Sequence, residues 1–186
     1  HDIEDFSKER VLRLLRFLRG EPASSFEGTV GIETYSRALQ PHSPGLAGRV
    51  WYGGFLSSAI CAGEQGLNYL TSSVVNTEGS ASTDFATVQA EHIDAYRAHH
   101  PNPRSSRVSQ GLVVIPTDSA SPDQIERYQR YRDSRLARTR EPVGPRGLLF
   151  SPDLVGPSEM IAETLSAHAG FQRTDDVAFA LPFTFD

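Results

Sequence analysis

The feature that most constrains the fold is the apolar run Leu112-Val113-Val114-Ile115, which lies within a predicted strand at 107–116. Successive strand residues point to opposite faces, so an unbroken apolar run indicates a strand that is buried on both sides, as in parallel sheets covered by helices. The pattern predicts further strands at 49–52, 67–75 and 176–183, and helices at 57–65, 83–99, 121–138 and 157–169. Strands that alternate with helices predict an α/β fold with a four-stranded parallel sheet.

Local capping residues support two of these helices. Ser121 is placed to cap a helix that has Pro122 at its first position and Gln124 where a capping box needs it. The helix at 157–169 is expected to start at Pro157 and to end with Gly170 as its C-cap. The first part of the chain, 1–48, is predicted to be an amphipathic helix over 5–19 followed by a long connection, with one short strand at 29–35.

The predicted sheet does not close on itself. Parallel strands of this kind form either a small doubly wound sheet or part of a (β/α)8 barrel, which takes about 250 residues, whereas this chain has 186. A half-barrel leaves apolar edge strands uncovered, which soluble proteins avoid. Either a partner supplies the remaining strands or the sequence is part of a longer polypeptide. The start at His1 rather than Met, almost directly inside a helix, favours the second interpretation.

Composition excludes several classes of function. The net charge of −5 argues against general binding to nucleic acid, and a single cysteine offers no internal disulfide, so a reducing cytoplasm is expected. No apolar run approaches the roughly 20 residues that cross a membrane. The six histidines lack the spacing of a metal-binding motif, so no metal site is predicted.

The stretch Gly53-Gly54-Phe55-Leu56-Ser57-Ser58 lies where a predicted strand passes into a helix. Glycines allow a tight turn and close approach of a ligand, and hydroxyls at a helix start lie beside free N–H groups, so the stretch is a candidate phosphate site. The alternative is an ordinary turn in which Ser57 or Ser58 caps the helix. The stretch is neither a Walker loop nor a dinucleotide fingerprint.

Residues 49–70, RVWYGGFLSSAICAGEQGLNYL, resemble the middle of the bacterial luciferase-like, flavin-dependent monooxygenases. Residues 154–165, LVGPSEMIAETL, and the final strand at 176–183 resemble the end of the same family. The resemblance covers about residues 5–186 but corresponds only to the second half of the family's (β/α)8 TIM barrel. It therefore implies that 1–186 is the C-terminal half of one barrel domain. Its parts are a helix and long connection (1–48), a βαβαβ unit (49–116), an insert or lid (117–155) and the last helix and strand (156–186).

This resemblance implies a flavin-dependent monooxygenase, an oxidoreductase that uses reduced FMN and O₂ to oxygenate a small organic substrate. A separate flavin reductase would supply the reduced FMN, and the protein would form a homodimer or homotetramer in the cytoplasm, with no nucleic acid or membrane as partner. Two alternatives stay open. One is an F420-dependent hydride-transfer oxidoreductase on the same scaffold, and the other is a non-catalytic flavin-binding or assembly protein.

The resemblance also implies which residues contact the cofactor. The flavin phosphate would lie against the turn and helix start, formed by Gly53, Gly54, Phe55, Ser57 and Ser58. The flavin ring would lie near Ser72 and Ser73, after the next strand. Most residues suspected of catalysis come from the first half of the family's barrel, so the sequence predicts no catalytic residue.

The insert at 117–155 is longer than the roughly 2–6 residues that usually flank a crossover helix. In the luciferase-like family the corresponding region contains a mobile loop over the flavin. Basic residues here could draw an anionic substrate under a closing lid, with Arg146 as the residue to test. The basic residues are Arg135, Arg138, Arg140 and Arg146. The alternative is a solvated charged helix with acidic partners, namely Glu126, Asp133 and Glu141.

Overall fold

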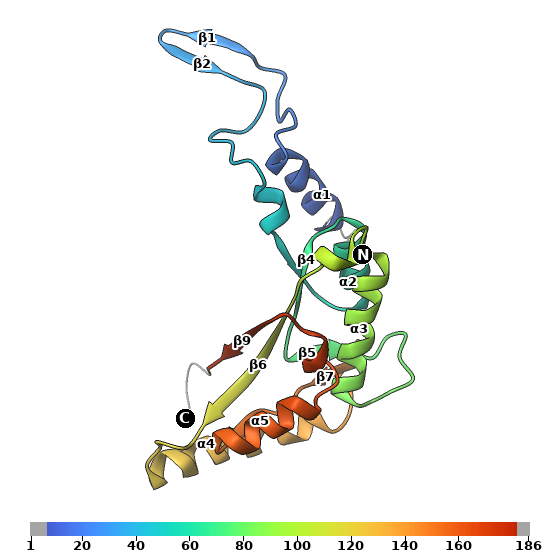
Figure 1. Ribbon diagram of the computed structural model, residues 1–186, viewed down its shortest axis with the longest axis vertical. Coiled ribbons are helices and arrows are strands. Elements are labelled where there is room, and N and C mark those ends of the chain that lie inside the picture. Colours follow the sequence, from blue (N-terminus) through green and yellow to red (C-terminus); the bar gives the residue numbers. More distant parts are fainter. Residues whose placement is uncertain (1–6, 182–186) are drawn as a thin grey trace. The chain divides into compact units, whose positions relative to one another are not determined.

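The computed structural model describes residues 7–181 (Figure 1). The chain divides into two compact units, His1–Val50 and Trp51–Asp186, and each is described by itself. No helix among the residues that the structure describes is both long enough and apolar enough to cross a membrane.

The first unit begins with α1 (Ser7–Leu18) and ends with a 3-10 helix (Leu46–Arg49). The single strand predicted at 29–35 is wrong, because these residues form an antiparallel hairpin of β1 (Gly28–Val30) and β2 (Glu33–Tyr35). The reason is Gly31, whose φ of 63° lets the chain reverse between the two strands. The first two residues of the predicted helix at 5–19 lie outside the described residues.

The second unit is built on a five-stranded parallel sheet within the described residues. Its strands are β3 (Trp51–Gly53), β4 (Asn68–Thr71), β6 (Val108–Pro116), β8 (Leu154–Gly156) and β9 (Asp176–Ala180). The order is β3-β4-β6-β8, and β9 also pairs with β6. The α/β class is confirmed, the predicted number of strands is one too few, and the described sheet is open rather than closed into a barrel.

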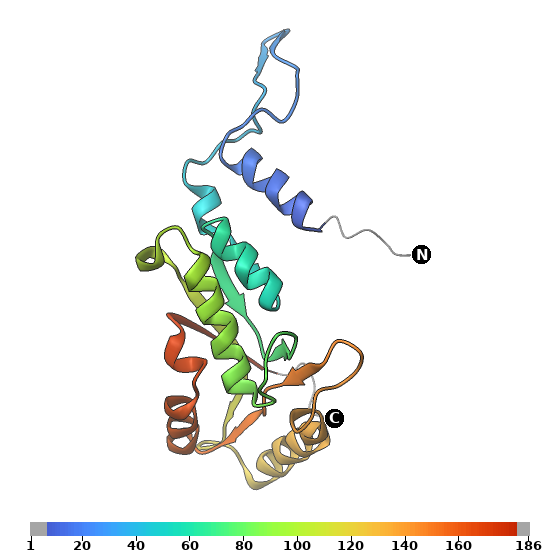
Figure 2. The same cartoon turned by 90° about the vertical axis from the view of Figure 1, so that its right-hand side faces the viewer.

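Between these strands the described chain forms four α-helices, which can be followed by colour in Figure 2. They are α2 (Leu56–Glu64), α3 (Phe85–His99), α4 (Pro122–Arg135) and α5 (Ser158–Ala167). The capping box predicted at Ser121 is confirmed, with both reciprocal hydrogen bonds to Gln124 present. Gly170 is not a C-cap, because α5 ends at Ala167 with His168 as its C-cap, and Gly170 has a helical φ of −67°.

Strand β6 is the centre of the core, as its apolar run predicts. Leu112 and Val114 belong to a buried cluster with α3 and α5, while Val113 and Ile115 belong to a second cluster with β8 and α4. Alternate residues of one strand therefore pack on opposite faces of the sheet. The two faces of β6 are both covered by protein.

The segment after β4 departs most from the sequence prediction. The strand predicted at 67–75 breaks at Ser72, whose Oγ accepts a hydrogen bond from the Val74 N–H group (3.2 Å). A short strand, β5 (Val74–Asn76), then pairs antiparallel with β7 (Leu148–Phe150). The sequence predicts no strand between 116 and 176, but this region contains β7 and β8. The predicted final strand at 176–183 is β9 up to Ala180, and its last two positions lie outside the described residues.

Candidate functional site

The parallel pairing of β3 with β4 places the two predicted cofactor segments at the same end of the sheet, where the strands finish. Gly53 pairs with Leu70 in the register of these strands. The turn at Gly53-Gly54 and the segment Ser72-Ser73 therefore both follow the carboxyl ends of neighbouring strands. Ligands of open α/β sheets bind at this end of the sheet.

Gly54 has a backbone conformation that side chains rarely adopt, with a φ of 146°. A Cβ atom added there would lie 2.6 Å from the Cβ atom of Ser58, in the first turn of α2. Gly53 differs, because its φ is ordinary and an added Cβ would meet the Leu70 carbonyl oxygen at 3.4 Å. Of the two glycines, only Gly54 is therefore required by the fold of the turn.

The side chain of a buried tyrosine is hydrogen-bonded to the main chain of this turn. The Tyr69 hydroxyl donates a hydrogen bond to the Gly54 carbonyl oxygen (2.8 Å), and its ring packs against Tyr96 with 5.4 Å between ring centres. Tyr69 is fully buried, and burial raises the pKa of its hydroxyl, which keeps the donor protonated. Sequence reasoning missed Tyr69, since it occupies a core position of a predicted strand.

The start of α2 presents free polar groups. Phe55 is the N-cap residue, and no side chain caps the helix, so the interpretation of Ser57 or Ser58 as N-cap is wrong. The first N–H groups of a helix have no acceptor within it, and they carry its positive dipole end. The hydroxyls of Ser57 and Ser58 make no hydrogen bond to any described residue. The turn thus offers backbone and hydroxyl donors to a ligand.

The segment Ser72-Ser73 is fixed in place by hydrogen bonds to its main-chain carbonyl groups. The Ser72 carbonyl accepts a hydrogen bond from Gln89 Nε2 of α3 (3.0 Å), and the Ser73 carbonyl accepts one from the Ser151 N–H group (2.9 Å). The Ser72 hydroxyl also donates to the Val74 carbonyl (3.1 Å). Ser72 is exposed and Ser73 is partly buried, so both are accessible at this end of the sheet.

A buried amide network lies behind this segment. Gln89 Nε2 also donates to Thr71 Oγ1 (3.2 Å), and Gln110 Nε2 donates to Gln89 Oε1. All three side chains are almost completely buried. The sequence gives no sign of this network, because glutamines in an apolar strand and an amphipathic helix are ordinary surface residues by pattern.

The basic residues of the predicted insert have different environments. Arg146 is exposed in the turn between Val143 and β7, and it forms no ion pair with a described residue. Arg135 instead forms two hydrogen bonds to Asp153, at 2.5 and 3.2 Å. The guanidinium of Arg138 lies over the Phe150 ring, 4.3 Å from its centre. The predicted solvated face is therefore wrong for Arg135 and Arg138.

The predicted acidic partners do not bind these two arginines. Glu126 pairs with Arg130 at 3.9 Å, and Asp133 pairs with Arg132 at 2.8 Å. The acceptor for Arg135 is Asp153, which the sequence prediction did not include. Charged residues that are close in sequence do not predict the partner of Arg135. Its partner, Asp153, lies after β7, eighteen positions later, and is brought next to the end of α4 by the folding of the chain.

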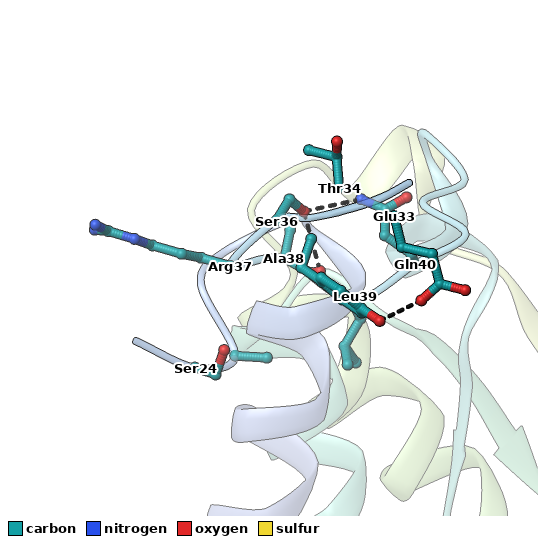
Figure 3. Close-up of a pocket in the computed structure, with 10 residues that line it drawn as sticks. Ser24, Glu33, Thr34, Ser36, Arg37, Ala38, Leu39 and Gln40 are labelled. Carbon is teal, nitrogen blue, oxygen red and sulfur yellow. Dashed lines mark hydrogen bonds between the residues drawn. The ribbon is translucent and has the colours of Figure 1, made fainter. Parts of the chain in front are cut away.

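Cavities among the described residues lie away from this site. One, of about 680 Å³, is formed by the hairpin segment of the first unit, where Gln40 Nε2 donates to Ser36 Oγ at 3.2 Å (Figure 3). Another, of about 490 Å³, is apolar and lies between β6, α5 and β9. Neither is lined by a residue of the predicted cofactor site. In residues 7–181 no group of three His, Cys, Asp or Glu side chains could hold a metal ion.

Comparison with known proteins identifies the fold but no family. No protein-family model matches the chain. No curated protein matches it either. A crystal structure of apo-MsnO8 is similar, with a TM-score of 0.59 over 97% of this chain at 20% sequence identity. The chain spans about half of that protein, 56% of its length, and at this identity the similarity concerns the fold alone.

Proposed function

We propose that this chain is the flavin-binding part of a flavin-dependent monooxygenase of the bacterial luciferase-like type, on a (β/α)8 barrel. Reduced FMN from a separate reductase and O₂ would be its co-substrates, and a small organic molecule would be oxygenated. The protein would act as a homodimer or homotetramer in the cytoplasm. The sequence resemblance at 49–70 and 154–165 supports this proposal.

The observation that carries the proposal is the turn at Gly54. Its φ of 146° and its close contact with Ser58 allow only glycine there, and this fixes the path of the backbone into the start of α2. Free N–H groups, the positive end of the helix dipole and two hydroxyls without hydrogen bonds form a donor set that suits a phosphate. The residues present therefore fit the phosphate group of FMN.

Each residue of the turn has a separate part in this proposal. Gly54 sets the backbone angle, and Tyr69 fixes the Gly54 carbonyl from inside the core. Ser57 and Ser58 donate to the phosphate, and Ser72 and Ser73 border the flavin ring. When bound, reduced FMN supplies the electrons that activate O₂, and the protein positions the ring and excludes water from it.

A pair of titrations tests the phosphate site. FMN and riboflavin are titrated into the purified protein, with quenching of flavin fluorescence as the readout. FMN should bind roughly ten times more tightly than riboflavin, because two or more charge-assisted hydrogen bonds are lost without the phosphate. Ser58→Ala should reduce that preference, while Ser134→Ala, at an exposed position on α4, should leave it unchanged. Equal affinities for the two flavins would refute the phosphate site.

Activity measurements separate the proposal from its alternatives. With a flavin reductase and NADH, a monooxygenase consumes O₂ in step with oxygenation of substrate. Binding and reduction of F420 without O₂ consumption would instead support the hydride-transfer enzyme. Flavin binding with neither activity would support a non-catalytic flavin-binding or assembly protein.

A further inference from the structure

Five side chains form what we call the arginine cluster: Tyr131, Arg135, Arg138, Phe150 and Asp153. They come from the end of α4, the following 3-10 helix (Leu136–Thr139), β7 and the turn before β8. Each guanidinium lies over an aromatic ring, with Arg135 4.6 Å from the centre of Tyr131 and Arg138 4.3 Å from that of Phe150. These rings orient both arginines.

The charges of the cluster do not balance. The one carboxylate, Asp153, has a side chain that is only 3% exposed, and each of its two oxygens accepts a hydrogen bond from Arg135. Arg138 is left as a second cation, and its Nε atom is shielded from solvent with no hydrogen-bond partner. Within residues 7–181 its side chain donates no hydrogen bond at all.

Burying an unpaired cation costs free energy unless an anion pairs with it. Burial lowers the pKa of Arg138, and the charge of Arg135 lowers it further, although Asp153 and Tyr131 act in the opposite direction. A guanidinium nevertheless keeps its charge in proteins. The cluster therefore has one positive charge and several donors available for a ligand.

The cluster adjoins the segment that the proposed function places near the flavin ring. Phe150 pairs with Val74 in the register of β5 and β7. The next residue, Ser151, donates its N–H group to the Ser73 carbonyl (2.9 Å). The ring beneath Arg138 is thus joined by main-chain pairing to the segment at Ser72-Ser73.

We propose that Arg138 binds an anionic group of the substrate, a carboxylate, sulfonate or phosphate. The positive charge and free donors of the arginine cluster are the evidence that an anion binds there. That this anion belongs to the substrate rests on the proposed function. Phe150 holds the guanidinium plane so that its N–H groups meet two oxygens of the anion, which is the geometry that arginine favours. Arg146, which the sequence made the residue to test, is exposed and lacks such a support.

The test measures anion binding in the absence of flavin. Sulfate and methanesulfonate are titrated by calorimetry at constant ionic strength into the purified wild-type protein and two variants. Arg138→Met keeps a side chain on Phe150 but removes the charge, and it should weaken binding roughly tenfold or more. Arg146→Met removes the same charge from the exposed turn and should bind both anions as the wild type does.

A stability measurement separates binding from a structural role. Without anion, Arg138→Met should be as stable as the wild type or more stable, because it removes an unpaired cation beside Arg135. An anion-binding residue is expected to combine lost binding with undiminished stability. If Arg138→Met does not fold, Arg138→Lys replaces it, and its affinity should fall severalfold because the forked donor is lost.

Three results would overturn the proposal: no saturable binding by the wild type, unchanged affinity in the Arg138 variant that folds, or an equal loss in Arg146→Met. If Arg138→Met weakens FMN but not riboflavin, Arg138 holds the cofactor phosphate, and the assignment to substrate is wrong. If the wild type binds no flavin while sulfate binding still depends on Arg138, the anion site stands and the flavin function fails.

Discussion

Replacing Gly54 with alanine should destabilise the protein through two separate effects. The φ of 146° costs an L residue about 1–3 kcal/mol. The new Cβ atom, 2.6 Å from the Cβ atom of Ser58, forces the turn and α2 apart, at a further cost of about 1–3 kcal/mol. The free energy of unfolding should therefore fall by about 4 kcal/mol, and the Tm by roughly 8–16 °C for a chain of this size.

The assay is urea unfolding followed by far-UV circular dichroism, with Gly53→Ala as the matched control. An added Cβ at Gly53 meets only an ordinary contact at 3.4 Å, so this variant should lie within about 0.5 kcal/mol of the wild type. In the folded state at low temperature, Gly54→Ala should also bind FMN more weakly, because the displaced turn no longer presents its donors together.

A double variant separates the two effects. Ser58→Gly removes the atoms that an alanine at position 54 would strike, so Gly54→Ala should cost about 1–3 kcal/mol less in a Ser58→Gly background than in the wild type. The cost of the backbone angle remains. A Gly54→Ala variant as stable as Gly53→Ala, or equal costs in both backgrounds, would refute the described geometry of the turn.

Three further predictions follow from buried polar groups. Tyr69→Phe removes the hydrogen bond to the Gly54 carbonyl and should lower the unfolding free energy by about 1–2 kcal/mol, with a matching loss of FMN preference over riboflavin. Arg135→Met leaves the buried Asp153 carboxylate without its partner and should cost about 2–4 kcal/mol, whereas the double variant Arg135→Met/Asp153→Leu should recover much of this loss in urea unfolding. Burial lowers the pKa of His92, so the unfolded chain binds more protons than the folded one below about pH 6.5. Stability should therefore be complete above that pH and fall as the pH decreases, by at most about 1.4 kcal/mol per pH unit from this group, and His92→Leu should flatten the slope measured between pH 7.5 and 5.

The parts of the fold that the sequence predicts correctly are those fixed by local patterns. Strand β6 is apolar on both faces, and few other structures satisfy such a run. The capping box of α4 needs only Ser121 and Gln124, which are three positions apart. In both cases the residues that decide the structure lie next to one another in the sequence.

The errors come from pairings between distant segments. The strand predicted at 67–75 breaks because β5 has a partner in β7, more than seventy positions later. Neither segment has a strong strand pattern alone, since each is only three residues long. Their stability comes from each other and from the buried side chains of Val75 and Leu149. No local periodicity predicts such a pair.

The same limit decides which arginine of the insert has a chemical role. By sequence, Arg135, Arg138 and Arg146 are equivalent cations in a charged, proline-containing region. The β5–β7 pairing makes them unequal. It brings Phe150 beneath Arg138 and places Asp153 next to Arg135, while Arg146 is left in the exposed turn that connects to β7. A distant strand pair thus determines which cation is neutralised, which is solvated and which keeps an unpaired buried donor. Only the last of these has a physical reason to bind an anion.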